Sequence, residues 1–406
     1  MYHTIKNTNI ERHLRRVLFR HFDGSEEFKM YGTNVVQFGD RPSAAIAVTA
    51  VRKTAEIYSH INPTAAERII DDSYVDDIAT GEDDYESVET LKAGITDILA
   101  YGGFKLKGFV TSGDVSDDDL LLLGAGNIGL VLGIGWDPRE DVFTVRVSVS
   151  LETKRKAASK ESDLGFDQIP SIVKTKVTKR ILLSIVNSCY DPYGLLVALT
   201  IQMRIALRDV CKSNVSWDDD LSEETKQSWV KILQRMKQAE EIRFRRCVRP
   251  SNSVGKPQLI VCNDGSELAM CATAHIRWEC EDGTVWCQLW CAKARVAPLK
   301  KLTIPKIELQ SAVLGSRLAK PVIDNSIWEF SKVHRIVDLE CTLATFKKDS
   351  VALPEFEQNR VQECLDSSSF DDWKHARSKN NIADLGTRDN ATVESISAMS
   401  EWQLGA

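Results

Sequence analysis

The chain has 406 residues, of which 43% are hydrophobic, 27% are charged, 22 are glycine and 11 are proline. This is the composition of a globular protein, and it excludes collagen-like, low-complexity and wholly disordered chains. The length predicts two or three domains, each large enough to bury a core. Because the net charge is −6, any binding to nucleic acid must depend on local basic patches.

The sequence contains no sign of a membrane segment or of export. It has no apolar run of about 18 residues, the length of a membrane helix. Four arginines in the first 20 residues interrupt the apolar core that a secretory signal needs. We therefore expect an intracellular protein, in the cytoplasm or the nucleus. All ten cysteines lie at or after Cys189 and none forms a CxxC pair, which favours reduced thiols over a zinc site.

The first part of the chain, residues 1–150, has the pattern of an α/β unit followed by a β-ribbon. We expect a helix at residues 41–58 and two short strands around residues 74–77. A second helix should follow at residues 85–99 and a further strand at residues 104–110. A hairpin should follow at residues 131–136 and 142–149, with its turn at Asp137-Pro138.

The rest of the chain predicts a helical region and a second α/β domain. Residues 151–253 contain three amphipathic segments, at 179–186, 196–210 and 223–237. Residues 254–395 contain three strand-like runs at 258–263, 270–278 and 285–292. A helix follows at 306–318, then a strand at 333–338, a short strand at 373–377 and a terminal turn or helix at 381–388. Residues 396–406 form a tail. The predicted fold class is thus α/β with several domains.

A glycine-rich segment, Gly124 to Gly129, fits the pattern G-x-G-x-x-G and follows four leucines. A dinucleotide-binding turn needs a helix that starts at these glycines, because the pyrophosphate lies at the helix N-terminus. Gly133, Gly135 and Pro138 follow closely and disfavour such a helix. We therefore interpret the segment as a glycine-rich loop and keep the dinucleotide site as the alternative.

Two adjacent carboxylates, Asp76 and Asp77, follow Tyr74-Val75 at the turn between the two short predicted strands. Such a turn is either an exposed acidic tip or a place where divalent metal ions bind, because hard oxygen ligands suit Mg²⁺. The turn at Gln37-Phe38-Gly39 precedes it, and a strand that carries Lys105 follows it. In this order the segments resemble the palm of a reverse transcriptase.

More narrowly, the chain resembles the polyprotein of BEL/Pao retrotransposons. The segments that carry this resemblance are RKTAE at 52–56, DSYVDDI at 72–78, GGFKLKG at 102–108, LGIGWD at 132–137 and YDPYGL at 190–195. The resemblance implies a partial palm in residues 1–150 and a thumb or connection in residues 151–253. It also implies that Asp76 and Asp77 bind metal, and that the substrate-contacting residues are Gln37, Phe38, Gly39, Tyr74 and Lys105.

Four acidic residues of the second domain lie at the ends of predicted strands or on helices: Asp264, Glu308, Asp338 and Asp384. Convergent carboxylates repel one another and are tolerated mainly where divalent cations offset their charge. Glu308 shares a helix face with small residues that allow close packing on a sheet. If the fold brings these four acids together, the group predicts two-metal hydrolysis of a phosphodiester.

These acids occur in segments that resemble the ribonuclease H domain of the same retroelement family: VCNDGS at 261–266, ARVAPLKK at 294–301, IPKIELQ at 304–310, AVLG at 312–315 and IADL at 382–385. The resemblance implies that all four acids are catalytic metal ligands for Mg²⁺ or Mn²⁺. It implies RNA, DNA and RNA–DNA hybrids as partners, together with other segments of the polyprotein such as a protease and an integrase.

Two departures from the family pattern qualify this interpretation. Asp338 lies in the sequence VDLECTL rather than in the usual Asp-Ser context, and Met1 to Lys6 resemble residues that follow the first palm aspartate. That aspartate and the fingers are absent from this chain, so we expect ribonuclease H activity without polymerase activity. The alternatives are a catalytically inactive protein that binds nucleic acid or other partners, and a relic with no role.

A basic cluster, Arg243, Arg245 and Arg246, lies between the helical region and the second domain. Clustered arginines bind backbone phosphates without reading sequence, so this cluster is a predicted substrate contact. An ordinary solvated surface is the alternative.

Overall fold

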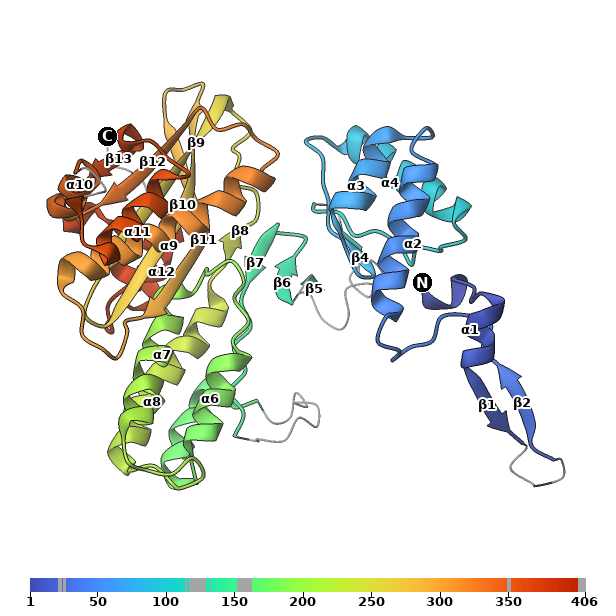
Figure 1. The fold of residues 1–406 in the computed structure, drawn as a ribbon, viewed down its shortest axis with the longest axis horizontal. Coiled ribbons are helices and arrows are strands. Elements are labelled where there is room, and N and C mark those ends of the chain that lie inside the picture. Colours follow the sequence, from blue (N-terminus) through green and yellow to red (C-terminus); the bar gives the residue numbers. More distant parts are fainter. Residues whose placement is uncertain are drawn as a thin grey trace. The chain divides into compact units, whose positions relative to one another are not determined.

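A computed structural model describes residues 1–20, 24, 27–113, 115–116, 129–131, 133–151, 163–348 and 352–400. The chain forms two compact units, residues 1–132 and 133–406, and each is described by itself (Figure 1). Residues 124–128 of the glycine-rich segment and residues 401–406 of the predicted tail lie outside the described residues. No helix among the described residues is long and apolar enough to cross a membrane.

The first unit is mainly helical. Its elements are η1 (Tyr2–Thr4), α1 (Asn9–Leu14), β1 (Arg16–Phe19), β2 (Lys29–Gly32), α2 (Ser43–Ile57), α3 (Pro63–Asp71), β3 (Ser73–Tyr74), β4 (Asp77–Ile78), α4 (Tyr85–Tyr101) and β5 (Gly129–Val131). The apolar faces of α2, α3 and α4 form one core, in which Ala55, Ala65 and Ala66 allow close packing. The two predicted helices and two short strands around residues 74–77 are confirmed, but α3 was not predicted, and its last turn contains Ile69-Ile70, which were expected to belong to the first strand.

The predicted strand at residues 104–110 is wrong. The segment has no ladder partner among the described residues, although Phe104, Leu106 and Phe109 pack against the helical core. Its alternating pattern therefore reflects an extended chain that lies with one side on helices. Periodicity reports which side is buried, but a strand also needs a neighbour for its N–H and C=O groups.

The second unit begins with a hairpin and a group of helices. Its first elements are β6 (Ile134–Asp137), β7 (Val142–Thr144), η3 (Phe166–Lys174), α6 (Lys179–Ser188), α7 (Val197–Lys212), α8 (Glu223–Gln238), η4 (Ala239–Glu241) and β8 (Phe244–Arg245). The three amphipathic helices are confirmed. β7 pairs with both β6 and β8, so the hairpin belongs to this unit, whereas its sequence position grouped it with residues 1–150.

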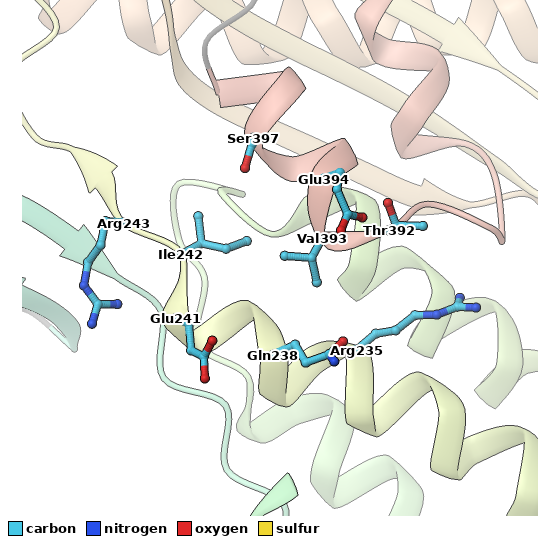
Figure 2. A pocket seen from close by; sticks show the side chains of 9 residues that line it. All are labelled: Arg235, Gln238, Glu241, Ile242, Arg243, Thr392, Val393, Glu394 and Ser397. Carbon is cyan, nitrogen blue, oxygen red and sulfur yellow. The ribbon is translucent and has the colours of Figure 1, made fainter.

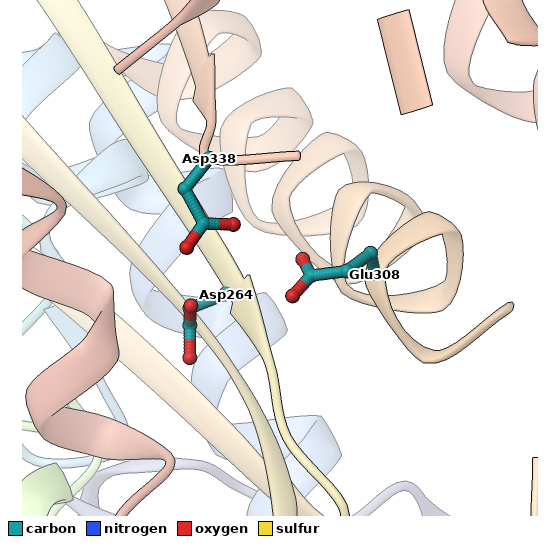
Figure 3. Close-up of side chains that lie close together, drawn as sticks. All are labelled: Asp264, Glu308 and Asp338. Carbon is teal, nitrogen blue, oxygen red and sulfur yellow. The ribbon is translucent and has the colours of Figure 1, made fainter. Parts of the chain in front are cut away.

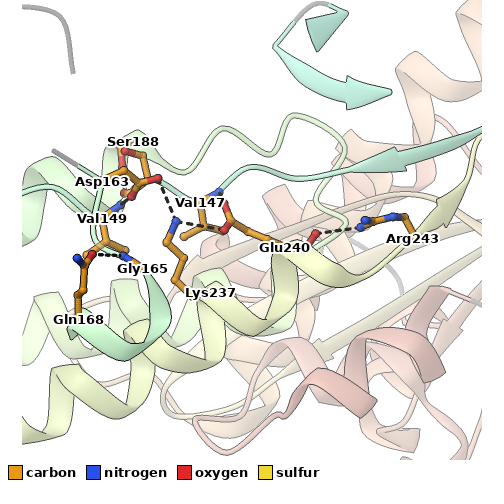
Figure 4. Close-up of polar contacts among 10 residues, drawn as sticks. Val147, Val149, Asp163, Gly165, Gln168, Ser188, Lys237, Glu240 and Arg243 are labelled. Atoms are coloured by element: carbon orange, nitrogen blue, oxygen red, sulfur yellow. Dashed lines mark hydrogen bonds and ion pairs between the residues drawn. The ribbon is translucent and has the colours of Figure 1, made fainter. Parts of the chain in front are cut away.

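The segment after β7 is held by carboxylates instead of a strand partner (Figure 4). The backbone N–H of Val147 donates to Glu240 Oε1 and that of Val149 to Asp163 Oδ1, each at 2.7 Å. Lys237 Nζ bridges the same carboxylates, 3.0 Å from Asp163 Oδ2 and 3.1 Å from Glu240 Oε2. Its side chain is only 8% exposed, and the two carboxylates offset its buried charge.

A five-stranded mixed sheet follows, in the order β11-β10-β9-β12-β13. Its elements are β9 (Ser253–Gly265), β10 (Ala269–Cys280), β11 (Val285–Val296), α9 (Ile304–Asn325), β12 (Lys332–Val337), α10 (Glu340–Phe346), α11 (Glu355–Leu365), η6 (Phe370–Asp372), β13 (Trp373–His375), η7 (Ser378–Asn380), η8 (Ile382–Gly386) and α12 (Val393–Ser400). The first three strands are antiparallel, and β12 runs parallel to β9 and β13.

Helices cover both faces of this sheet. On one face, Ala319 and Val322 of α9 pack against Leu259, Val261 and Ala274. On the other face, one large core includes residues of the helical group, of the sheet and of α12, from Val145 to Met399. Residues 151–253 and 254–395, predicted to be separate domains, both contribute to this core. The predicted tail begins inside α12, where Ile396 and Met399 are fully buried.

Candidate metal centre

Three acidic side chains meet at one end of the sheet. Asp264 lies near the end of β9, Asp338 follows β12, and Glu308 lies in the second turn of α9. The parallel register pairs Ile336 with Cys262, so two residues further along Asp338 lies beside Asp264. Each of the three carboxyl groups offers one oxygen, and these oxygens lie within 4.8 Å of one another. Figure 3 shows the three carboxyl groups pointing toward one another.

Small residues bring α9 close enough for Glu308 to reach the other two acids. Gly315 lies directly over Asn263, so that a Cβ at this position would overlap the amide of Asn263. Gly265 lies under the start of the helix, where an added Cβ would come within 2.8 Å of Ile307 Cγ2. Ser311 and Ala312 are completely buried on the same helix face. The small-residue face noted in the sequence therefore sets the distance between Glu308 and the sheet.

The electrostatics of the group favour a bound cation. Burial, together with the charges of Asp264 and Asp338, raises the pKa of Glu308 to about 9. Burial also raises the pKa of Asp264 to about 7, against a hydrogen bond from Thr387 and with the help of Asp338 and Asp384. Glu308 Oε2 and Asp338 Oδ1 are buried and have no hydrogen-bond partner among the residues that the structure describes. Unpartnered carboxylate oxygens of this kind fit a hard divalent cation.

Residues 178–338 match the family model of the Pao retrotransposon-like RNaseH-like domain. The match begins just before α6 and ends at Asp338, so it contains all three clustered acids. It supports the predicted resemblance to a BEL/Pao polyprotein for this ribonuclease H-like part of the chain, and with it a retroelement ribonuclease H-like function. The matched segment is less than half of the chain and contains neither the first unit nor Asp384. No curated protein matches the chain.

The raised pKa values in the ribonuclease H-like domain predict a pH dependence of stability. A carboxyl group whose pKa is higher in the folded protein favours folding while protonated, and this contribution is lost as the pH rises through the folded pKa. For Glu308 this window runs from 4.5 to about 9. In a metal chelator, the melting temperature should therefore fall across this window, and Glu308→Gln should make the fall shallower.

The control for this measurement is Glu363→Gln, which removes an acid on α11 that pairs with Arg317 at the surface. It should leave the pH profile of the melting temperature unchanged, and added Mg²⁺ should raise the melting temperature of the unmodified protein most at high pH. A profile that Glu308→Gln does not alter would mean that Glu308 is not a buried acid in the folded protein.

Asp384, the fourth predicted acid, adjoins the three clustered acids but is not one of the group within 4.8 Å. It lies in η8 and forms a two-pronged ion pair with Arg388, Nε to Oδ2 at 2.6 Å and Nη2 to Oδ1 at 2.7 Å. Its charge nevertheless contributes to the raised pKa of Asp264. Its role as a metal ligand stays a prediction.

Sequence reasoning missed the polar residues that support Asp264. Thr387 donates its hydroxyl hydrogen bond to Asp264 Oδ2 and also lies 3.0 Å from the carbonyl oxygen of Asp384. Asn381 Nδ2 donates to the carbonyl oxygen of Asn263 at 2.8 Å. Thr387 and Asn381 lie three residues on either side of Asp384, and that flanking position was the only signal in the sequence that could have indicated them.

The arginine cluster is divided among different partners. Arg246 forms a two-pronged ion pair with Asp141, at 2.6 and 2.9 Å, which ties β8 to the hairpin. The Arg245 guanidinium lies over the ring of Trp286, 5.0 Å from its centre. Arg243 Nη1 donates to the carbonyl oxygen of Glu240 at 3.1 Å. Their role in binding phosphate stays a prediction, and Arg246 has a structural role besides.

Arg243 also lines a hollow of 650 Å³ between the end of α8 and the start of α12. Figure 2 shows Glu241 and Glu394 among its lining residues, together with Arg235. Because the lining carries both signs of charge, it has no clear preference for an anion. The hollow contains none of the clustered acids.

In the first unit, the predicted palm residues are exposed. β3 and β4 form a hairpin whose two-residue turn is Val75-Asp76, and Val75 has φ 56°, which a β-branched residue rarely adopts. Tyr74, Asp76, Asp77 and Lys105 are all exposed. Among the described residues, Asp76 and Asp77 belong to no group of three potential metal ligands.

The turn at residues 37–39 is shaped by contacts within the first unit. The carbonyl oxygen of Gln37 accepts a hydrogen bond from Ser43 Oγ at 2.7 Å, Phe38 packs on Tyr2 with ring centres 4.6 Å apart, and Gly39 has φ 88°. A positive φ favours glycine at this position. The proposed nucleotide contacts of this turn stay predictions.

Proposed function

We propose that the second unit hydrolyses the RNA strand of RNA–DNA hybrids. The observation that carries this proposal is the buried group of Asp264, Glu308 and Asp338, two of whose oxygens have no hydrogen-bond partner in the described part of the chain. These residues would hold Mg²⁺ or Mn²⁺, with Asp384 as a further ligand. When bound there, such ions supply an activated water and stabilise the leaving oxygen of a phosphodiester.

The chain's own residues orient this site. The Thr387 hydroxyl fixes one oxygen of Asp264, and α9 holds Glu308 over the sheet. Selectivity for the hybrid would come from groove shape and from 2′-hydroxyl contacts on one strand, since this needs no reading of bases. Arg243 and Arg245 are the proposed backbone-phosphate contacts of the hybrid.

The test is cleavage of a labelled RNA–DNA hybrid by the full 406-residue chain. We expect RNA cleavage in Mg²⁺ or Mn²⁺, none in chelator, and none of the DNA strand or of duplex DNA. A folded protein that binds the hybrid without cleaving it would replace this proposal by the inactive, nucleic-acid-binding alternative.

For the rest of the chain, the resemblance supports a polymerase origin. We propose that the first unit derives from a reverse transcriptase palm, with Gln37, Phe38, Gly39, Tyr74 and Lys105 as its contacts to nucleotide or template and Asp76 and Asp77 as metal ligands. Helices α6, α7 and α8 lie inside the segment that matches the ribonuclease H-like family model, and we propose that they correspond to the thumb or connection ahead of the sheet. Because no third described acid joins Asp76 and Asp77, we propose that this chain does not extend primers.

The partners and the setting follow the same proposal. RNA, DNA and their hybrid are the substrates, and protease and integrase segments of the same polyprotein are the proposed protein partners. All ten cysteines are free thiols, which fits action inside the cell, in the cytoplasm or the nucleus.

A further inference from the structure

Arg388 connects the candidate metal centre to the surface. Its side chain is 55% exposed, whereas that of Asp384, whose carboxylate it contacts through two guanidinium nitrogens, is 23% exposed. The guanidinium therefore covers a half-buried carboxylate and faces solvent on its outer side. A planar fork of this kind binds a carboxylate and a phosphate with the same geometry.

The residues around this ion pair link it to the clustered acids. Thr387, next to Arg388, donates to Asp264 and also contacts the backbone of Asp384. The turn that carries the ion pair is thus fixed to the metal centre at one point. Asp384 itself stays outside the group of three whose oxygens lie within 4.8 Å.

We propose that Arg388 is a latch that holds Asp384 out of the metal centre until a backbone phosphate of the hybrid takes its guanidinium. This proposal rests on the proposed function, because it assigns the trigger for completing that same site. Without nucleic acid, the ion pair neutralises one of four neighbouring acids. When the hybrid binds, the phosphate replaces Asp384 as the partner of Arg388, and the released carboxylate completes the set of ligands.

The experiment compares Arg388→Gln, Asp384→Asn and the double variant in the full chain, with two readouts that need no catalysis. The first is the affinity for Mn²⁺ without nucleic acid, by titration calorimetry. The second is the affinity for an RNA–DNA hybrid in chelator. The matched control is Arg317→Gln, because Arg317 forms a two-pronged surface ion pair with Glu363 at 2.5 and 2.9 Å and is 53% exposed.

The latch predicts that the two single variants change the affinity for the hybrid in opposite directions. Arg388→Gln should bind Mn²⁺ about tenfold more tightly and the hybrid about tenfold more weakly. The slope of its hybrid affinity against salt concentration should fall by the amount that corresponds to about one lost phosphate contact. Asp384→Asn should bind the hybrid several-fold more tightly, because it frees the guanidinium. In the double variant, the gain in Mn²⁺ affinity should vanish, because it requires the Asp384 carboxylate.

A purely structural ion pair would give a different pattern. Both single variants would then lower the melting temperature and leave both affinities unchanged, as Arg317→Gln should. That result, or a double variant that keeps the gain in Mn²⁺ affinity, overturns the latch. If the unmodified protein cleaves the hybrid but the affinities do not move, only the latch fails. If it does not cleave, the proposed function fails, and the Mn²⁺ titrations still decide about the latch.

Discussion

Glu308→Gln and Asp264→Asn are each expected to slow cleavage of the hybrid by more than about 100-fold. Loss of a residue that only supports a metal ligand costs about 10–100-fold, and loss of the ligand itself should cost more. Each amide keeps the shape of the side chain but removes the charge that holds a cation. In chelator both variants should melt at a higher temperature than the unmodified protein, since they relieve repulsion among buried acids. The measurements are single-turnover cleavage rates and melting curves.

Asp338→Asn belongs to the same series, because Asp338 is the residue whose sequence context departs from the family. If Asp338 is a ligand, its amide loses activity as the others do. An active Asp338→Asn protein would transfer the third position to another acid, and Glu340 is the nearest in sequence. Glu363→Gln, on the surface of α11, should retain full activity.

Gly315→Ala is expected to destabilise the second unit, although alanine is the better helix former by about 1 kcal/mol. The added methyl group would overlap the side chain of Asn263, which cannot move freely because its Nδ2 donates to the carbonyl oxygen of Ile336 at 3.0 Å. Overpacking of a filled core costs about 1–3 kcal/mol. This should lower the melting temperature by several degrees, and by displacing Asn263 it should also disturb Asp264 and slow cleavage.

The control for Gly315→Ala is Lys320→Ala, an exposed position on the same helix whose ion pair with Asp324 contributes little. Denaturant unfolding of both variants separates the effect of helix propensity, which both substitutions change, from the effect of overpacking against Asn263, which only Gly315→Ala introduces. A Gly315→Ala protein more stable than the original would show that helix propensity outweighs the contact with Asn263, and that α9 lies further from the sheet than described.

The strongly periodic elements could be predicted from the sequence, and the elements that depend on distant partners could not. In α7 and α8 the apolar residues recur on one side of the helix within a few turns, so their spacing was sufficient to predict these helices. β8 has two residues and exists because β7 lies beside it. The prediction for the extended segment that contains Phe104 was wrong for the opposite reason. Its alternation was real, but no strand among the described residues lies next to it.

The candidate site shows the same division. Asp264, Glu308 and Asp338 were indicated by their places at strand ends and on a small-residue helix face, and the structure brings these three together. The ion pair between Asp384 and Arg388 was readable in principle, because Arg388 lies four residues further along. Which of two partners a carboxylate takes depends on distances in space, and these are not set by sequence spacing alone.

The shared core of the second unit limits how this protein can be dissected. Val145, Leu182 and Leu199 pack in the same cluster as Leu289 and Met399. A fragment that started at the first strand of the sheet would expose one apolar face of it to water, and one that stopped at Asp338 would lose the strand and the terminal helix that follow. The smallest piece suitable for separate expression therefore starts ahead of the hairpin at Ile134 and extends through α12.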